Sequence, residues 1–343
     1  MSQAVTYLSV QEHYNRGLHV LAVLTAAATF PLIFMGGLVT SHGAGLSVPD
    51  WPNSFGYNMF TFPPSQWVQG VLYEHTHRLA GTAVGLLSIL LVLWAFFNEP
   101  RRWVRWLAVS VLGLVILQGI LGGLRVVWVN LDLAIVHACV GQAFFCLTAL
   151  MVAATSRWWL NENRTSPAFL FRTAVLCLAL IYLQLIVGAV MRHFQAGLAI
   201  PDLPLAYGKL LPPISDQAVN EVNAWRATQD GLAPVTLGQI WIHFAHRLGA
   251  VVLAIVLGHL VHQIARNSRE LKLLMRPAWW LTGLFFLQIA LGILVVLLQK
   301  PADVTSAHVA VGALVLLTTF VIAVRARRLS ASRQTLVPAV TVA

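Results

Sequence analysis

YEHTHRLAGTAVGLLSILLVLWAFF, residues 73–97, decides the fold of this chain. From Leu79 to Phe97 the stretch carries no charged side chain, and a helix of roughly 20 apolar residues crosses a bilayer core of about 30 Å. Other stretches share this length and character. The sequence therefore predicts eight membrane-spanning helices, near 18–40, 73–97, 103–127, 132–156, 169–191, 238–265, 275–299 and 304–325.

The overall composition excludes a water-soluble fold. Of the 343 residues, 58% are hydrophobic and only 10% are charged, whereas soluble domains carry about 25% charged residues. We therefore expect an all-α polytopic protein that lies in the lipid bilayer. The cysteines Cys139, Cys146 and Cys177 fall within the apolar stretches, where they pack as small hydrophobic side chains, so no disulfide is predicted.

The placement of positive charge predicts the orientation. Lys and Arg are concentrated after the second, fourth, sixth and eighth predicted helices, as at 101–105 and 325–328. By the positive-inside rule both termini lie in the cytoplasm, and the long segments 41–72 and 193–237 lie outside the inner or plasma membrane. This bias accounts for most of the net charge of +10, which needs no nucleic-acid partner to explain it.

The chain also repeats itself. Each half holds four predicted helices, so both halves enter the membrane from the same side, as in a parallel repeat. We predict two four-helix bundles, residues 1–160 and residues 161–343, with the boundary in the polar stretch 157–168. The matches are Gly45-Leu46-x-x-Pro49-Asp50 with Gly197-Leu198-x-x-Pro201-Asp202, His77-Arg78-Leu79 with His246-Arg247-Leu248, Leu117-Gln118-x-x-Leu121-Gly122 with Leu287-Gln288-x-x-Leu291-Gly292, and the segments around His137 and His308.

The repeat selects four of the twelve histidines. His77 and His137 lie near the outer ends of the second and fourth helices of the first half, and His246 and His308 occupy the same places in the second. An ionisable residue inside a membrane faces the bundle interior and is a functional candidate. Two imidazoles at equal depth on facing helices can bind one haem iron from both sides. A single histidine there would more often be an interfacial residue.

One carboxylate breaks the symmetry of the halves. Glu74 precedes His77 by three residues on the same helical face, and His243 stands at the corresponding place before His246. A Glu beside an iron centre can accept or relay protons, so one site is expected to react and the other is not. The alternative is that Glu74 forms an ion pair with Arg78, one turn further on. A di-iron site is rejected because the facing helices offer no further Glu.

Other residues near the histidines have less specific roles. Arg78 and Arg247 could bind haem propionates or act as interfacial anchors, with neither role favoured. His75 is two residues from His77 and points to another side of the helix. Nearby glycines could make room for a haem in the packing: Gly81, Gly85, Gly141, Gly249 and Gly312.

Together these motifs resemble the haem A synthase family over roughly residues 20–325. The resemblance implies oxidation of the C8 methyl group of haem O to a formyl group, by two successive hydroxylations, to make haem A for terminal oxidases. It implies a haem b cofactor on His246 and His308. It also implies that substrate haem O binds at His77 and His137, with Glu74 essential for the chemistry.

The resemblance further implies haem O synthase as the upstream partner. The electron donor is not identified by any residue, and a homo-oligomer is left open. Two features depart from the family: segment 193–237 lacks the cysteine pair that some members carry, and Thr40 stands where many have Arg, although Arg192 occupies the repeat position. The rival interpretations are a cytochrome b-type electron-transfer protein, which would not explain the single Glu, and a transporter with histidine proton relays.

Overall fold

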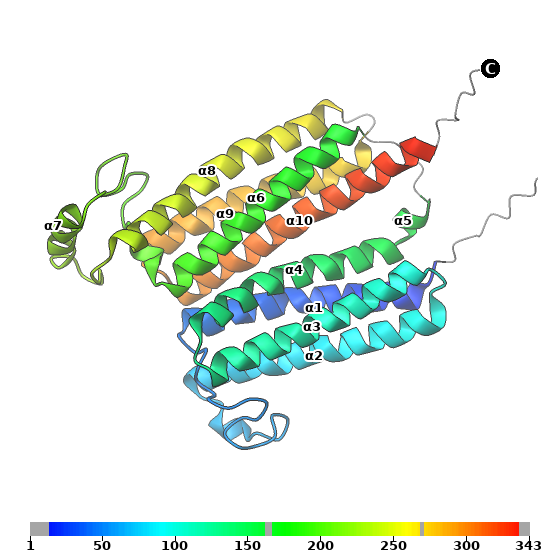
Figure 1. Ribbon diagram of the computed structural model, residues 1–343, viewed down its shortest axis with the longest axis horizontal. Helices are drawn as coiled ribbons and strands as arrows, with labels where there is room; N and C mark the ends of the chain where they lie inside the picture. The colour runs from blue at the N-terminus through cyan, green and yellow to red at the C-terminus, as the bar shows by residue number, and fades with distance from the viewer. Residues whose placement is uncertain (1–13, 162–166, 268–270, 336–343) are drawn as a thin grey trace, which may run out of the picture.

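The computed structural model describes residues 14–161, 167–267 and 271–335 (Figure 1). Within these residues eight helices are long and apolar enough to cross a membrane, which confirms the predicted all-α fold. No residue in the described ranges belongs to a β-strand beyond isolated bridges at Ser54–Tyr57 and Ala206–Lys209. The helices are α1 (Arg16–Ser41), α2 (Gln69–Asn98), α3 (Arg102–Val127), α4 (Leu131–Thr155), α6 (Ala168–His193), α8 (Leu237–Arg266), α9 (Lys272–Leu297) and α10 (Ala302–Thr335).

Shorter helices lie in the connections. These are η1 (Pro64–Gln66), α5 (Arg157–Asn161), η2 (Ala196–Leu198) and α7 (Asp216–Arg226). The sequence did not predict α7, which lies within the second outer segment and projects from the bundle in Figure 1. Residues 1–13 and 336–343 of the two predicted cytoplasmic tails, and residues 162–166 of the predicted boundary between the halves, lie outside the described residues.

Local sequence explains where several spanning helices begin. The first backbone N–H groups of a helix have no partner inside it, and a side chain at the N-cap supplies one. Asn15 caps α1 and Asn130 caps α4 in this way. Thr236 and Gln239 form a reciprocal capping box at the start of α8. The caps on α4 and α8 therefore define the ends of two helices that carry predicted haem ligands.

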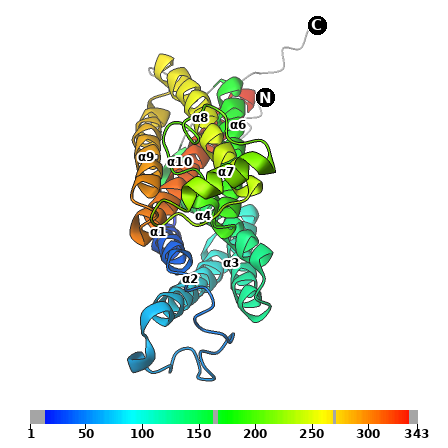
Figure 2. The same cartoon turned by 90° about the vertical axis from the view of Figure 1, so that its left-hand side faces the viewer.

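The spanning helices pack as two groups of four, which Figures 1 and 2 show from two sides. In the first group α1, α2, α3 and α4 contact one another in chain order, and α4 returns to α1. In the second group α6, α8, α9 and α10 do the same, and α10 returns to α6. The groups meet where α1 and α4 face α10 and where α4 faces α6. This packing supports the division into two repeated bundles, which stays a prediction.

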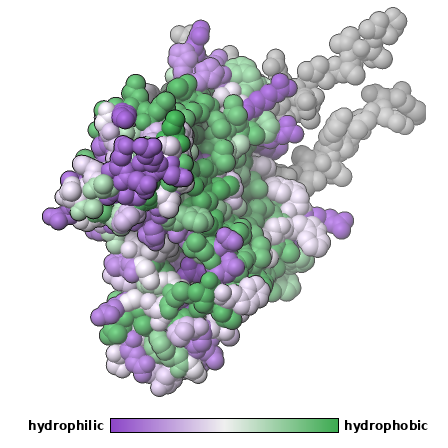
Figure 3. All heavy atoms as spheres, turned by 60° about the vertical axis from the view of Figure 1, so that its left-hand side comes forward, coloured by the Kyte–Doolittle hydropathy of each residue, from purple (hydrophilic) through white to green (hydrophobic). Residues whose placement is uncertain are grey.

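The flanks of the bundle are apolar, as a lipid-facing surface must be. Large hydrophobic side chains such as Leu86 on α2, Ile255 on α8 and Phe286 on α9 are exposed there. The space-filling view shows this apolar flank in green, with hydrophilic side chains gathered on the outer segments (Figure 3). The helices that bear the four predicted ligands all begin at the end where these segments lie, so the histidines lie toward one end of the bundle.

Candidate functional site

The four predicted ligands lie within the first turns of α2, α4, α8 and α10, and all four are half-buried. In the second half the His246 and His308 rings are neighbours in an edge-on arrangement, with centroids 6.4 Å apart and planes inclined by 67°. When one iron binds two imidazoles from opposite sides, each coordinating nitrogen lies about 2 Å from the iron and about 1 Å from the centroid of its own ring. The two centroids are then about 6 Å apart. The pair therefore fits axial ligation of one haem.

Glutamines contact both imidazoles of the second half. The Nε2 atom of Gln184 on α6 lies 3.1 Å from Nδ1 of His246. Nδ1 of His308 lies 3.1 Å from the backbone oxygen of Gln288 on α9, and the side-chain nitrogen of Gln288 lies 3.3 Å from Nε2 of the same ring. A partner at Nδ1 holds a ligand imidazole in one orientation and leaves Nε2 as the nitrogen for the metal. The contacts at Nδ1 of His246 and His308 are of this kind, whereas the side-chain nitrogen of Gln288 lies at the Nε2 atom that a metal would take.

The imidazoles of the first half lack these contacts. Within the described part of the chain, Nδ1 of His77 and of His137 has no partner at hydrogen-bonding geometry, and neither has Nε2 of Gln118. The backbones of Leu32 and Gln118 approach the two rings without reaching that geometry. Leu32 occupies the repeat position of Gln184, so a side chain that could hold His77 is missing from the first half.

Glycines that the sequence analysis did not single out lie behind the imidazoles. Gly36, Gly122, Gly188 and Gly292 each approach the ring of one predicted ligand. Gly122 and Gly292 belong to a repeated motif, and that repetition was the available signal. Of the glycines that were predicted to make room, Gly81 and Gly85 have nothing within 4 Å of a built Cβ, while the other three face glutamine side chains: Gly141, Gly249 and Gly312 face Gln118, Gln184 and Gln288.

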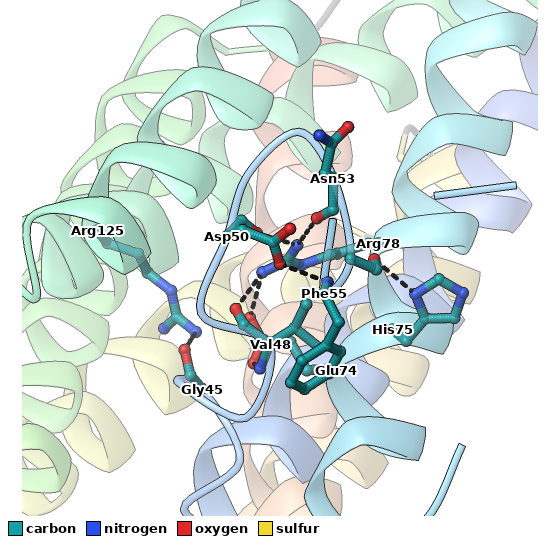
Figure 4. Close-up of polar contacts among 10 residues, drawn as sticks. Gly45, Val48, Asp50, Asn53, Phe55, Glu74, His75, Arg78 and Arg125 are labelled. Carbon is teal, nitrogen blue, oxygen red and sulfur yellow. Dashed lines mark hydrogen bonds and ion pairs between the residues drawn. The ribbon is translucent and has the colours of Figure 1, made fainter. Parts of the chain in front are cut away.

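Glu74 is buried at the outer end of α2, beneath the first outer segment (Figure 4). Its Oε2 atom accepts a hydrogen bond of 3.0 Å from the backbone N–H of Val48, and its Oε1 atom forms an ion pair of 2.8 Å with Arg78. The same guanidinium donates to the backbone oxygens of Val48, Asp50 and Asn53 at 2.8, 2.7 and 3.1 Å. The ion pair is the one that the alternative interpretation of Glu74 expected, and through it Arg78 also joins the carboxylate to the loop.

The second half has the same arrangement of an arginine that binds loop carbonyl groups, with a histidine in place of the carboxylate. Nδ1 of His243 accepts from the backbone N–H of Ile200 at 3.2 Å, and its Nε2 atom lies 3.2 Å from Nε of Arg247. Arg247 donates to the backbone oxygens of Ile200, Asp202 and Leu205 at 2.7, 2.8 and 3.1 Å. Both arginines therefore bind loop carbonyl groups, a role that sequence reasoning missed.

The aspartates of the repeated Gly-Leu-x-x-Pro-Asp motif hold tight turns. Asp50 accepts from the backbone N–H groups of Phe55 and Gly56 at 2.7 and 2.8 Å, and Asp202 accepts from Tyr207 and Gly208 at 2.8 and 2.9 Å. Partial burial alone would raise the pKa of Asp50, but these N–H donors and the Arg78 guanidinium lower it below its ordinary value.

Other polar residues around the site serve the loops and the contact between the halves. His75 points away from the first pair, as predicted: its Nδ1 atom lies 3.1 Å from Ser54 Oγ, and its ring packs against Phe62 and Trp67. Arg125 on α3 donates to the backbone oxygen of Gly45 at 2.9 Å. Arg192 on α6 donates across the two halves to the backbone oxygen of Gly37 and to the hydroxyl of Ser41 on α1.

Comparison with known proteins gives consistent results. The COX15-CtaA family, described as cytochrome oxidase assembly protein, matches residues 19–321. A protein of Symbiobacterium thermophilum named Heme A synthase is 30% identical over 292 residues, covering 81% of this chain and 85% of its own length. A Heme A synthase of Rhodopseudomonas palustris (strain HaA2) is 28% identical over 359 residues, covering 94% of this chain and 93% of its own. One from Shouchella clausii is 26% identical, with coverages of 82% and 88%.

Proposed function

The chain belongs to the COX15-CtaA family of cytochrome oxidase assembly proteins, and from this premise we propose that it is a haem A synthase. It is then an oxidoreductase that converts the C8 methyl group of haem O to the formyl group of haem A. The observation that carries the proposal is the pair of neighbouring imidazoles at His246 and His308, together with His77 and His137 at the corresponding sequence positions of the first half. Histidine pairs at one depth suit a protein that handles two haems.

The two histidine pairs have different tasks in this proposal. His246 and His308 hold a resident haem b, which supplies an electron-transfer centre when it is bound. Their glutamine contacts support this assignment, because a ligand held in one orientation binds a permanent cofactor more tightly. His77 and His137 hold the substrate haem, which must enter and leave, and their Nδ1 atoms have no such contacts within the described residues.

Glu74 moves protons at the substrate site. Conversion of a methyl to a formyl group transfers protons along with the electrons that an external oxidant accepts, and a buried carboxylate one helical turn from His77 is placed to accept or relay those protons. The guanidinium of Arg78 holds the carboxylate at that place and ties it to the loop that covers the outer end of α2. His243 occupies the same place in the second half and supplies no carboxylate, in keeping with a haem that is not oxidised.

The protein lies in the inner or plasma membrane with its termini in the cytoplasm, so both haem sites lie toward the outer face. The positive charges between alternate helices support this orientation. Haem O synthase acts upstream and supplies the substrate.

Co-expression tests the function directly. The chain is produced with a haem O synthase in a host that makes no haem A, and the extracted haems are identified by mass. We expect haem A only when both proteins are present. Two permanently bound, spectrally equivalent b haems without haem A would instead indicate an electron-transfer cytochrome, and the absence of any haem absorbance from the purified protein would favour a transporter.

A further inference from the structure

Each predicted ligand rests against a glycine of the spanning helix that precedes its own. A Cβ atom built on Gly36 of α1 would lie 3.1 Å from Cε1 of His77 on α2. The same relation joins α3 to α4, α6 to α8 and α9 to α10. The corresponding distances are 3.1 Å from Gly122 to His137, 3.1 Å from Gly188 to His246 and 3.0 Å from Gly292 to His308.

The contact has the same geometry in all four places. The nearest ring atom is always Cε1, which lies between the two nitrogens, and Nδ1 and Nε2 follow at 3.5 to 4.0 Å. The surroundings differ, because glutamines contact the imidazoles of the second half at hydrogen-bonding geometry and do not do so in the first. The glycine contact is therefore independent of those partners and common to every predicted ligand.

Helix formation does not explain these glycines. A glycine inside a helix is less favourable than alanine, because its backbone loses more freedom on folding. None of the four has a positive φ that would demand glycine. Other glycines on the same helices, such as Gly119 on α3 and Gly283 on α9, have nothing within 4 Å of a built Cβ. Close approach to the imidazole is what distinguishes the four.

We propose that Gly36, Gly122, Gly188 and Gly292 are positioning residues that set the depth and tilt of the four haem-ligating imidazoles. The inference rests on the proposed function, since it assigns these imidazoles to haem iron. A methyl group at such a glycine would require the ring to move by a few tenths of an ångström. Metal–ligand distances in proteins hold within about 0.2 Å, so this shift is large enough to weaken ligation.

The resident haem provides the first test. Full-length Gly188→Ala and Gly292→Ala are purified beside Gly283→Ala, which adds the same methyl group to α9 in open space. We expect the first two to shift the low-spin electron paramagnetic resonance signal of the bis-histidine haem. We also expect them to lose haem to an excess of apomyoglobin about tenfold faster than the wild type, at the lower end of the 10–100-fold effects seen for outer partners of metal ligands. Gly283→Ala should match the wild type in both measurements.

The first half provides a second test with its own folding control. In Gly36→Ala and Gly122→Ala the haem b of the second half reports whether the chain is folded, and its signal should be unchanged. Binding of added haem O, followed by its absorbance change, should weaken by about tenfold. Gly119→Ala on α3 should bind haem O as the wild type does.

The outcomes separate the two proposals. A wild-type protein that holds no haem b, or a His246→Ala variant that retains it, would overturn the assignment of the ligands and with it the proposed function. A wild type with normal haem b, together with Gly188→Ala and Gly292→Ala variants of unchanged signal and retention, would overturn the role of the glycines alone. Normal binding of haem O by Gly36→Ala and Gly122→Ala would likewise overturn the role of the glycines alone.

Discussion

Both outer segments are held by an arginine of the helix that follows, Arg78 or Arg247, but they differ in the further contacts that hold them. In both, an arginine of the following helix binds three loop carbonyls, and an aspartate holds a tight turn. The second segment adds α7, whose Arg226 is 2% exposed and donates to the backbone oxygens of Ala233 and Leu198 at 2.7 and 3.1 Å. Tyr207 donates to the backbone oxygen of Ala199.

A small apolar core accompanies this extra support. Ala199, Ile200 and Ala206 of the second segment pack with Val219 of α7 and Ile240 of α8. Burial raises the pKa of Tyr207 against the opposite effect of Arg226, so its hydroxyl keeps its proton and remains a donor. The second segment, on the half of the proposed resident haem, thus has the support of α7 and this core, whereas the first is held by side-chain contacts such as those of Arg125 with Gly45 and of His75 with Ser54. This difference matches a cofactor that stays and a substrate that is exchanged.

The strongest test of the comparison removes one ligand from each half. His246→Ala should lose nearly all resident haem b, because it deletes an axial ligand, whereas His77→Ala should retain it. The haem content of the purified variants, measured by absorbance, decides between them. Retention in His246→Ala with loss in His77→Ala would exchange the tasks of the two halves.

Replacing Glu74 by histidine, the residue type at the corresponding position 243, tests whether the carboxylate transfers protons or only anchors the loop. Glu74→His introduces the side chain that accepts from the loop N–H in the second half, and Glu74→Gln keeps an oxygen acceptor at that place. Both should lower haem A formation by about 10²–10⁴-fold, the contribution typical of general acid–base groups. Extracted haems are quantified after co-expression with haem O synthase.

Resident haem b should be unchanged in both Glu74 variants, which serves as the control for folding. Haem A formation at the wild-type rate in Glu74→His would limit Glu74 to holding the loop through Val48 and Arg78.

The glutamine contacts offer a smaller and graded test. Gln184→Leu removes the partner of His246 and should weaken retention of haem b by about 10–100-fold. Leu32→Gln places a glutamine at the repeat position in the first half and should slow release of haem from it. Gln263→Leu is the matched control, because its amide contacts His259 at the other end of α8. Equal haem loss from Gln184→Leu and Gln263→Leu would contradict the ligand-holding role.

Acid should loosen the first outer segment slightly. The folded-state pKa of Asp50 is lowered, so its contribution to stability is complete above its ordinary value of 3.8 and is lost as the pH falls through the folded value. Pepsin cleavage within residues 42–68 should therefore become faster as the pH falls below about 4. Asp50→Asn should show faster cleavage with little change over this pH range. A wild-type segment whose cleavage keeps the same dependence on pH as Asp50→Asn would refute the effect.

Much of this architecture could be predicted because it depends only on the order of residues along the chain. The spanning helices follow from the length of apolar runs such as 73–97, and the observed α2 starts and ends within a few residues of that run. The repeat then selected His77, His137, His246 and His308 without any structure. The direction of His75 was also predictable, because residues two apart on a helix face different sides.

The contacts between helices were not predictable in this way. Gly36 and Gly188 occupy the same position in the repeat, but the sequence does not say what that position contacts, and only packing of adjacent helices brings them against an imidazole. Arg78 and Arg247 were assigned to propionates or to the interface, because a sequence does not reveal that loop carbonyls 25 to 30 residues before Arg78, or 42 to 47 before Arg247, need donors. The α7 helix was missed because its short, polar sequence carries no membrane signal.

The sequence by itself thus determined the number of spanning helices and the repeat, and it singled out four histidines as candidates, since hydropathy and periodicity depend only on order along the chain. Only the tertiary structure decided which glycine lies behind each imidazole, which glutamine contacts it and how firmly each loop is held. These depend on distances of about 3 Å between segments far apart in the chain, which no one-dimensional pattern encodes.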